Sequence, residues 1–378
     1  MTPSFSTSWT KCSWGKTRLA WQMAAGTFLG LLMAANAAGS LTPLYSSPAG
    51  AVSAVSIAQL QPLEVVTAVR NGSGDLEVIV WKDEGTAIVQ ASSATAGAIK
   101  EVAIAAVSSN QVVTAVANST GNLELILWKV DSSGKITKQY GTTYTLTVTR
   151  VSIVGLAVGA FATATRNSSG DLDVEVWKAG ASSFSLLAGS SGGAVSEVAI
   201  AALYYASPIG SQFVTAVRNG SGDLEVINWT VGPTTLTRGG HATLGSIEHL
   251  SIVAIGTLAT HTVYATAVIN GSGDLEYIEW SVLGNSVKEL GSGTAGAASG
   301  VAVCQGFPWA ITAIRNGSGD MSVEQWDDAT KPFSEAGKYN TASPVSAIAV
   351  APDAFIGSMI TAARSSTGDL EVTVWQEK

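Results

Sequence analysis

The chain has 378 residues, of which 46% are hydrophobic and 13% charged, and its formal net charge is −8. This composition excludes a disordered chain, because the apolar fraction is large enough to build a sizeable core. An acidic chain without basic runs also argues against nucleic acid or an anionic membrane surface as the partner.

The first segment, residues 1–37, differs in kind from the rest. Lys11, Lys16 and Arg18 precede an apolar stretch that ends in the tripeptide ANA at 35–37. A basic leader, an apolar segment and a small-x-small exit are typical of a secretory signal peptide, so we expect a secreted or periplasmic protein. The alternative is an uncleaved membrane anchor, because the stretch approaches spanning length. After removal of the signal, no membrane span is expected.

One short hairpin recurs seven times in the remaining chain, residues 38–378. Its first copy reads VTAVRNGSGDLEVIVW, Val66–Trp81, and its tryptophan returns at spacings of 46 to 52 residues. The seven tryptophans are Trp81, Trp128, Trp177, Trp229, Trp280, Trp326 and Trp375. A fixed period of this size is typical of solenoids, propellers or arrays.

Each unit contains four short apolar segments bounded by Gly, Ser and Asn clusters. In the second unit they are Val102–Val107, Val112–Asn118, Leu123–Val130 and the weaker Gly134–Tyr140. Runs of this length read as strands, and four strands per ~45–50 residues match one blade of a β-propeller. The sequence therefore predicts an all-β fold, a seven-bladed β-propeller of four-stranded antiparallel blades.

The chain ends predict how this ring closes. The last copy stops at Lys378, directly after its third strand, whereas residues 40–57 align with residues 183–200, which span a fourth strand and the next first strand. We therefore expect Leu41–Ser47 to complete the last blade beside Leu370–Trp375, a three-plus-one closure. Such a closure would remove the open sheet edges that promote aggregation.

The side chains of the third strands alternate along nearly apolar segments, so both faces of each blade are expected to pack against neighbours. The tryptophans are accordingly predicted to lie in the core between blades, with surface stacking platforms as the alternative. Cys304 lies in the apolar run GVAVC. It is the one cysteine beyond the leader, so an intramolecular disulfide is excluded and a buried, inert thiol is expected.

The turn between the second and third strands is the most repetitive element. In the first copy it runs from Arg70 through Asn71 and Gly74 to Asp75 and Glu77. Asn, Gly and Asp tolerate positive φ and bond the local backbone, which a tight hairpin requires. If Asn71 pairs with the residue after Asp75, Arg70 lies opposite Glu77, and a cross-strand ion pair would explain the recurring arginine.

The alternative is that these turns form a ring of ligand sites. Arginine, asparagine and aspartate beside a shallow polar groove can hydrogen-bond sugar hydroxyls, and repetition would add avidity. The candidate residues are Arg70, Asn71, Asp75, Arg166, Asn167, Asp171, Arg218, Asn219, Asp223, Arg315, Asn316 and Asp320. The turns lack the D-x-D-x-D spacing of calcium loops, so no metal and no cofactor is expected.

Two larger connections break the symmetry of the repeat. Tyr204, Tyr205 and Trp309 lie in them, where exposed aromatics could form one protein-interaction patch. Packing over a blade edge is the other interpretation. The three histidines, His241, His249 and His261, fall in one unit at spacings that match no zinc pattern.

The motif N-x-x-G-x-L-E-V, as in Asn71–Val78, resembles the repeat of bacterial and fungal seven-bladed propeller lectins. The resemblance implies a propeller that binds sugars such as fucose in pockets between blades. It favours a secreted, non-enzymatic, multivalent carbohydrate-binding protein whose partner is a glycan or cell-surface polymer. The alternative is a protein-interaction scaffold. A propeller enzyme is disfavoured, because near-identical repeats offer no singular catalytic set.

Overall fold

The computed structural model describes residues 41–203, 207–258, 261–306, 310–327, 333–353 and 358–377. They belong to one compact unit, Ala37–Lys378. All regular secondary structure in these residues is β-strand, which confirms the all-β prediction. The predicted signal peptide, residues 1–37, lies outside the described residues. Within the described part of the chain, no helix is long and apolar enough to cross a bilayer.

The strands alternate between one long strand and a hairpin of two shorter ones. The long strands, of 19 to 23 residues, are β1 (Leu41–Gln61), β4 (Ile88–Ser108), β7 (Ile136–Ala157), β10 (Phe184–Ala202), β13 (Leu236–Leu258), β16 (Ser286–Gln305) and β19 (Ser334–Pro352).

The first hairpin strands are β2 (Glu64–Asn71), β5 (Gln111–Asn118), β8 (Ala160–Asn167), β11 (Gln212–Asn219), β14 (His261–Asn270), β17 (Ala310–Asn316) and β20 (Ser358–Ser365). The second hairpin strands are β3 (Asp75–Asp83), β6 (Asn122–Val130), β9 (Asp171–Ala179), β12 (Asp223–Val231), β15 (Asp274–Leu283), β18 (Asp320–Asp327) and β21 (Asp369–Glu377). We number the repeat units 1 to 7 after these hairpins, so that β2–β3 is unit 1.

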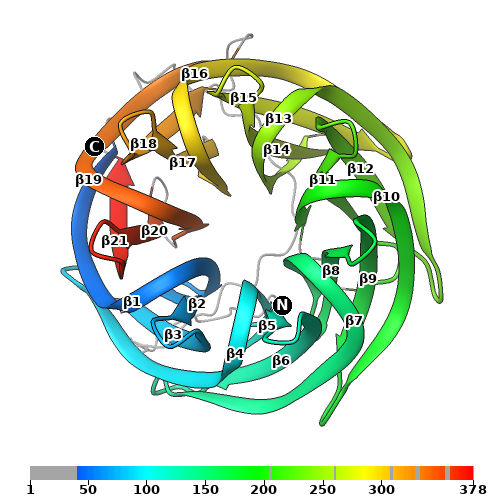
Figure 1. Cartoon of the computed structure of the whole chain (residues 1–378), viewed down its shortest axis with the longest axis horizontal. Helices are drawn as coiled ribbons and strands as arrows, with labels where there is room; N and C mark the ends of the chain where they lie inside the picture. The colour runs from blue at the N-terminus through cyan, green and yellow to red at the C-terminus, as the bar shows by residue number, and fades with distance from the viewer. Residues whose placement is uncertain are drawn as a thin grey trace, which may run out of the picture. The chain divides into compact units, whose positions relative to one another are not determined.

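The prediction of a seven-bladed propeller with separate four-stranded blades is wrong. The predicted fourth strand of one unit and first strand of the next are one continuous strand, so 21 strands form a single closed antiparallel sheet. In β4, for example, Ile88–Ala98 pairs with β3, and Ile99–Ser108 pairs with β5. The resemblance to propeller lectins therefore does not supply the fold. Figure 1 shows the long strands running from the rim of the ring towards its centre.

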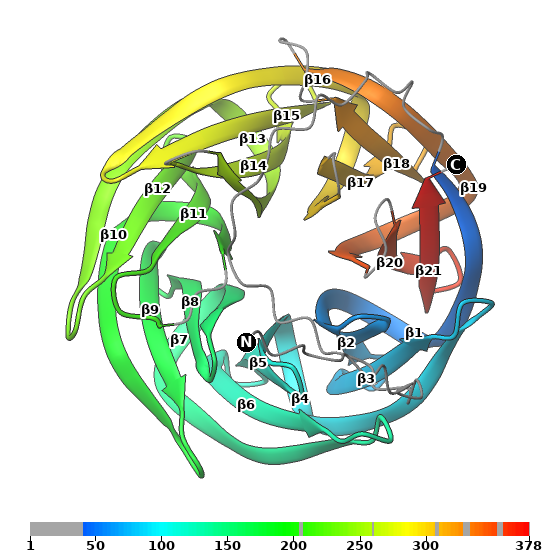
Figure 2. The same ribbon diagram turned by 180° about the vertical axis from the view of Figure 1, so that it is seen from behind.

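The ring closes where β1 pairs with β21. Their register runs from Leu41 opposite Glu377 to Ala51 opposite Asp369, with two irregularities. The expected pairing of Leu41–Ser47 with Leu370–Trp375 is thus present, but as part of the closed sheet. Figure 2 shows these two strands side by side. Because the second half of β1 continues into unit 1, no strand of the described sheet is left as an edge.

The core is built from one side-chain pair that recurs in all seven units. Each tryptophan of the hairpin is at most 3% exposed, and its Nε1 donates a hydrogen bond to the Oγ1 of a threonine fourteen residues earlier, as Trp81 does to Thr67 at 2.9 Å. The other pairs are Trp128–Thr114, Trp177–Thr163, Trp229–Thr215, Trp280–Thr266, Trp326–Thr312 and Trp375–Thr361. The tryptophans are buried as predicted, and each buried indole N–H has the partner it needs.

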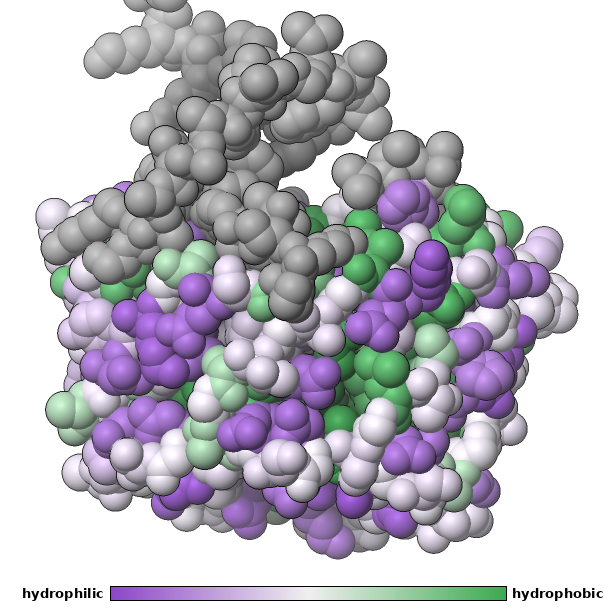
Figure 3. Space-filling view, turned by 90° about the horizontal axis from the view of Figure 1, so that it is seen from above, coloured by the Kyte–Doolittle hydropathy of each residue, from purple (hydrophilic) through white to green (hydrophobic). Residues whose placement is uncertain are grey.

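The hairpin turns and the bends of the long strands lie on one face, because a hydrogen bond joins them in every unit. In unit 1 the amide of Ile99, at the middle of β4, donates to the carbonyl of Gly74 at 2.9 Å. Gly74 has φ of +85°, a conformation that residues with a Cβ rarely adopt. We call this face, with the seven turns, the turn face. Figure 3 shows the ring edge-on, with hydrophobic residues interspersed among hydrophilic ones.

Candidate functional site

The asparagines at the heads of the turns build the turns themselves. The Oδ1 of Asn71 accepts hydrogen bonds from the amides of Ser73 and Asp75, both at 3.0 Å. Asn167, Asn219 and Asn316 accept the corresponding amides at 2.9 to 3.1 Å. The side-chain carbonyl oxygens of these asparagines therefore hold the turn backbone. The recurrence of asparagine at this position is explained by the turn itself.

The predicted ion pair between Arg70 and Glu77 is wrong. Arg70 pairs with Leu76 and Val69 with Glu77, so the true register differs by one residue from the one assumed. Arg70 instead donates from Nε to the carbonyl of Ile99 at 2.7 Å and from Nη1 to the hydroxyl of Ser53 at 2.9 Å.

The same arginine bridge recurs around the ring. In each case the guanidinium joins its own hairpin to the bend of the following long strand and to a hydroxyl on the preceding one. The further bridges run from Arg166 to Val195 and Thr149, from Arg218 to Ile247 and Ser196, and from Arg364 to Val52 and Ser346. Arg315 bonds Ser299 at 3.0 Å, while its buried Nε has no partner among the described residues.

The hydroxyl partners change together with the arginines. Where Ala117 and Ile269 replace the arginine, Lys100 and Glu248 stand at the position of the serine or threonine. This joint replacement could have been found in the sequence by comparing the long strands one residue after their central bend. The joint replacement indicates that the arginines stabilise the contact between neighbouring units. The guanidinium is a charged donor whose bonds to a carbonyl and a hydroxyl hold the hairpin against the two long strands beside it.

The aspartates of the candidate ring remain available to a ligand. Asp75, Asp171, Asp223 and Asp320 are half-buried. Among the described residues, no hydrogen bond or ion pair engages their carboxylates. Unlike the oxygens of the asparagine side chains, these carboxylates do not hold the turn by hydrogen bonds.

Cavities lie where neighbouring units meet. A cavity of about 370 Å³ lies between the turns of units 3 and 4, lined by Arg166, Ser169, Ser196, Arg218, Asn219 and Ser221 among others. At the next junction, between units 4 and 5, a cavity of about 390 Å³ is lined by Ser246, Asn270, Ser272, Glu276, Glu289 and Ser292 among others. Both cavities place turn residues beside hydroxyls of a long strand.

A third junction cavity adds aromatic groups. It has a volume of about 380 Å³, lies between units 6 and 7, and includes Leu44, Tyr339, Thr341, Glu371 and Trp375 in its lining. The rings of Tyr339 and Trp375 meet edge to face, with centroids 5.5 Å apart. Tyr339 breaks the repeat, because its equivalents are small residues such as Ala94 and Gly293.

The middle of the ring encloses a central channel. It has a volume of about 270 Å³ and is lined by the inner halves of the seven long strands, including Ser56, Ser152 and Ser251. At the mouth of this channel on the turn face, the residue two positions after the bend varies among the units. Around the ring these residues are Ala54, Glu101, Arg150, Glu197, His249, Gly300 and Ala347.

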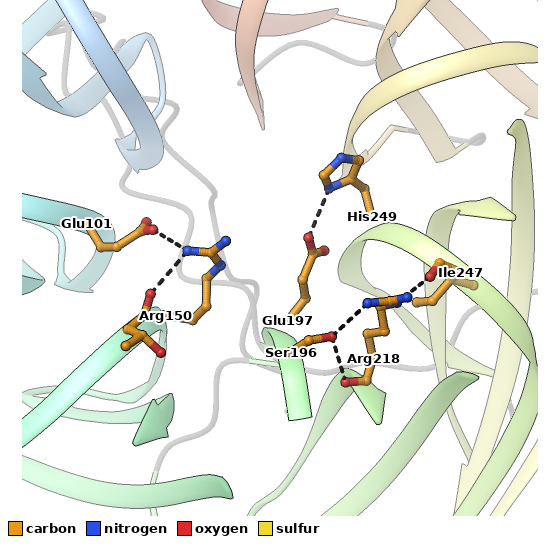
Figure 4. Close-up of polar contacts among 8 residues, drawn as sticks. Glu101, Arg150, Ser196, Glu197, Arg218, Ile247 and His249 are labelled. Carbon is orange, nitrogen blue, oxygen red and sulfur yellow. Dashed lines mark hydrogen bonds and ion pairs between the residues drawn. The ribbon is translucent and has the colours of Figure 1, made fainter. Parts of the chain in front are cut away.

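Four of them form two ion pairs at the mouth (Figure 4). Arg150 donates to Glu101 at 2.7 Å, and His249 lies 3.0 Å from Glu197. The hydrogen bond with Glu197 raises the pKa of His249 above its usual value. Burial raises the pKa of Glu101, although Arg150 opposes that shift. One half of the mouth is therefore charged, while the other half is small and uncharged, an asymmetry that the sequence analysis missed.

The predicted interaction patch, Tyr204, Tyr205 and Trp309, lies outside the described residues. Cys304 is buried, and burial raises the pKa of its thiol to about 12. Such a thiol is almost wholly protonated at neutral pH, which fits an inert role. The described residues contain no group of three histidine, cysteine or acidic side chains arranged to hold a metal ion.

Comparisons with known proteins support the fold and leave the function open. No family description matches the chain, and no curated protein matches it. Among solved structures, the crystal structure of Saccharomyces cerevisiae Sqt1 is similar over 90% of this chain and 100% of that chain, with a TM-score of 0.56 and 11% identity. At that identity the likeness concerns the fold alone, so the function is argued from the site.

Proposed function

We propose that the protein is a non-enzymatic binding protein that takes polyvalent carbohydrate in the cavities between its repeat units. The observation that carries this proposal is the recurrence of junction cavities of similar size, about 370 to 390 Å³, at three places around one ring. A volume of this order suits a small ligand or one or two sugar rings.

The lining of the cavities fits sugar chemistry. Hydroxyl groups of a sugar both donate and accept hydrogen bonds, and the cavities offer serine hydroxyls, asparagine amides and carboxylates such as Glu276. In the cavity between units 6 and 7, Tyr339 and Leu44 add an apolar wall beside Glu371. An apolar face of a sugar ring packs well against such a wall while its hydroxyls reach the polar side.

Repetition supports a polyvalent ligand in particular. A single shallow, polar cavity binds weakly, because much of its hydrogen bonding replaces bonds to water. Several such cavities fixed on one ring raise the effective concentration for a branched or polymeric glycan. The unengaged aspartates, Asp75, Asp171, Asp223 and Asp320, lie on the same face as the turns and can accept further hydroxyls.

The test is binding of the protein to a glycan array, with and without calcium, followed by titration of the best ligand. We expect Ser221→Trp and Ser272→Trp each to lower the number of sites, because these exposed turn residues line two of the cavities. Ser132→Trp is the matched control, since Ser132 is exposed in the β6–β7 loop, outside these cavities. Failure to bind any glycan in either condition contradicts the proposal.

A further inference from the structure

Each of the seven turns has a position beside its positive-φ glycine that a cation can occupy. In five units it is filled by arginine: the Nη2 of Arg70, Arg166, Arg218, Arg315 and Arg364 lies 3.1 to 3.5 Å from where a Cβ on that glycine would stand. In unit 2, which has Ala117 in place of the arginine, Lys100 reaches the same position from the neighbouring strand, with its Nζ 3.7 Å from the Cβ site of Gly121. Six of the seven turns therefore hold a cation supplied by the chain.

Unit 5 is different. Its arginine position is Ile269, which is fully buried and carries no charge. Around Gly273, no atom of the described residues beyond its chain neighbours lies within 4 Å of the Cβ site. The position that a guanidinium or ammonium group fills elsewhere is thus open to solvent in unit 5.

The backbone of unit 5 nevertheless keeps the geometry of the other units. The amide of Ala298 donates to the carbonyl of Gly273 at 2.9 Å, as Ile247 does to Gly222 at 3.0 Å. Gly273 has φ of +83°, against +90° for Gly222. The carbonyl of Ala298 therefore stands where the carbonyl of Ile247 stands in unit 4, and that carbonyl accepts the Nε of Arg218.

The remaining partner in unit 5 is more attractive to a cation than in any arginine unit. Glu248 occupies the position of Ser196, the hydroxyl that accepts the Nη1 of Arg218. A carboxylate accepts a guanidinium more strongly than a hydroxyl does, because the bond is charge-assisted on both sides. The neighbouring charges are those of the His249–Glu197 pair.

We infer that unit 5 binds a guanidinium group supplied by a ligand, held between the carbonyl of Ala298 and the carboxylate of Glu248 beside Gly273. The guanidinium is favoured over an ammonium group because its planar fork of donors matches two acceptors, as the five arginines in the other units do. This inference is independent of carbohydrate binding, which we place in the junction cavities. The guanidinium group can belong to a small molecule or to an arginine side chain of a protein, and the test separates these two sources.

The experiment follows the backbone amides of the full chain by NMR while arginine amide is added. We expect the amides of Gly273, Glu248 and Ala298 to shift saturably. Those of Gly74 and Gly222 should stay in place, because Arg70 and Arg218 already fill their positions. Citrulline amide, which has nearly the same shape but an uncharged side chain in place of the guanidinium, is the matched control ligand and should shift none of them. A peptide Gly-Arg-Gly tests the protein source: tighter binding than arginine amide favours an arginine of a partner, and equal binding favours a small molecule.

Two variants complete the test. Glu248→Gln keeps the shape of the side chain and should weaken binding of arginine amide by about tenfold, the loss expected for one charge-assisted contact. The double variant Ile269→Arg with Glu248→Ser rebuilds the arrangement of unit 4 and should abolish binding. If Ile269→Arg prevents folding, Glu248→Gln still decides the question. Equal shifts at Gly74 and Gly273, or a Glu248→Gln protein that binds like the parent, would overturn the inference.

Discussion

The tryptophan–threonine pairs and the channel mouth lie in the same seven units, yet they follow opposite rules. The pairs are the same in every unit, with Nε1 to Oγ1 distances of 2.8 to 3.0 Å. At the mouth, equivalent positions carry residues as different as Glu101, Arg150, His249 and Gly300. The buried pairs fill the same space in the core at every junction, so their residues cannot vary. The mouth has no such packing requirement, and its residues differ between units. Differences between units therefore show where the chain is free of that packing requirement.

The largest expected effect comes from the shared core. Trp229→Ala removes a side chain with 0% exposure and should lower the free energy of unfolding by about 3–5 kcal/mol. Because the seven sites are alike, Trp128→Ala should cost a similar amount. Denaturant unfolding measured by circular dichroism checks both. A cost that differs severalfold between the two variants would contradict the equivalence of the units.

A smaller effect is expected from the threonine of the same pair. Thr215→Val keeps the shape but leaves the indole N–H of Trp229 without its partner, at a site where neither residue is exposed. An unsatisfied buried donor costs about 1–3 kcal/mol. Thr215→Ser should recover part of that loss, and Thr234→Val, on an exposed loop, is the control. A Thr215→Val protein as stable as the parent would show that the hydrogen bond contributes little.

The arginine bridges lie between the core and the mouth, and their effect should be intermediate in size. Arg218→Met keeps much of the apolar stem but removes the donors to Ile247 and Ser196. We expect a loss of about 1–2 kcal/mol, because the side chain is half-buried and its bonds are partly screened by water. Differential scanning calorimetry measures it, with exposed Lys135→Met as the control. No change in melting temperature would mean that the bridges do not brace the units.

The sequence predicted the recurrence, the all-β fold and the pairing of the first described strand with the last, because these depend on a pattern repeated seven times. It did not predict that the fourth and first strands are continuous. The linking segments, such as ATAGA at 94–98, are rich in Ala, Gly and Ser and resemble loops, yet they stay extended and pair with the neighbouring hairpin. Composition alone cannot separate an extended loop from a strand of small residues.

The error in the arginine partner has a similar cause. The assumed hairpin register differed by one residue from the true one, and a shift of one residue changes every cross-strand neighbour. The threonine partners of the tryptophans were visible in the sequence, since each lies fourteen residues earlier, but nothing in the pattern marked the threonine as buried. The charged half of the mouth needed an alignment of the inner strand segments, where the repeat is weakest.

The smallest expected effect belongs to the mouth and concerns pH. The hydrogen bond with Glu197 raises the pKa of His249, so Glu197→Gln should lower it, and Glu225→Gln, which removes an acid elsewhere in the ring, should leave it unchanged. A pKa that is higher in the folded chain stabilises the fold below the unfolded value of about 6.5. That stability is lost as pH rises through the folded pKa.

The His249 side chain is 50% exposed, so water screens its ion pair with Glu197. The change in the free energy of unfolding should therefore stay below about 1 kcal/mol. NMR titration of the imidazole measures the change in pKa directly. At pH values above the folded pKa of His249 the imidazole loses its positive charge, so the net charge of the mouth becomes more negative. The charged half of the mouth thus contains a group whose charge responds to mild changes of pH, whereas the seven indole–threonine pairs do not titrate. If the pKa of His249 is the same in the parent and in Glu197→Gln, the ion pair does not set that pKa, and this contrast between core and mouth is wrong.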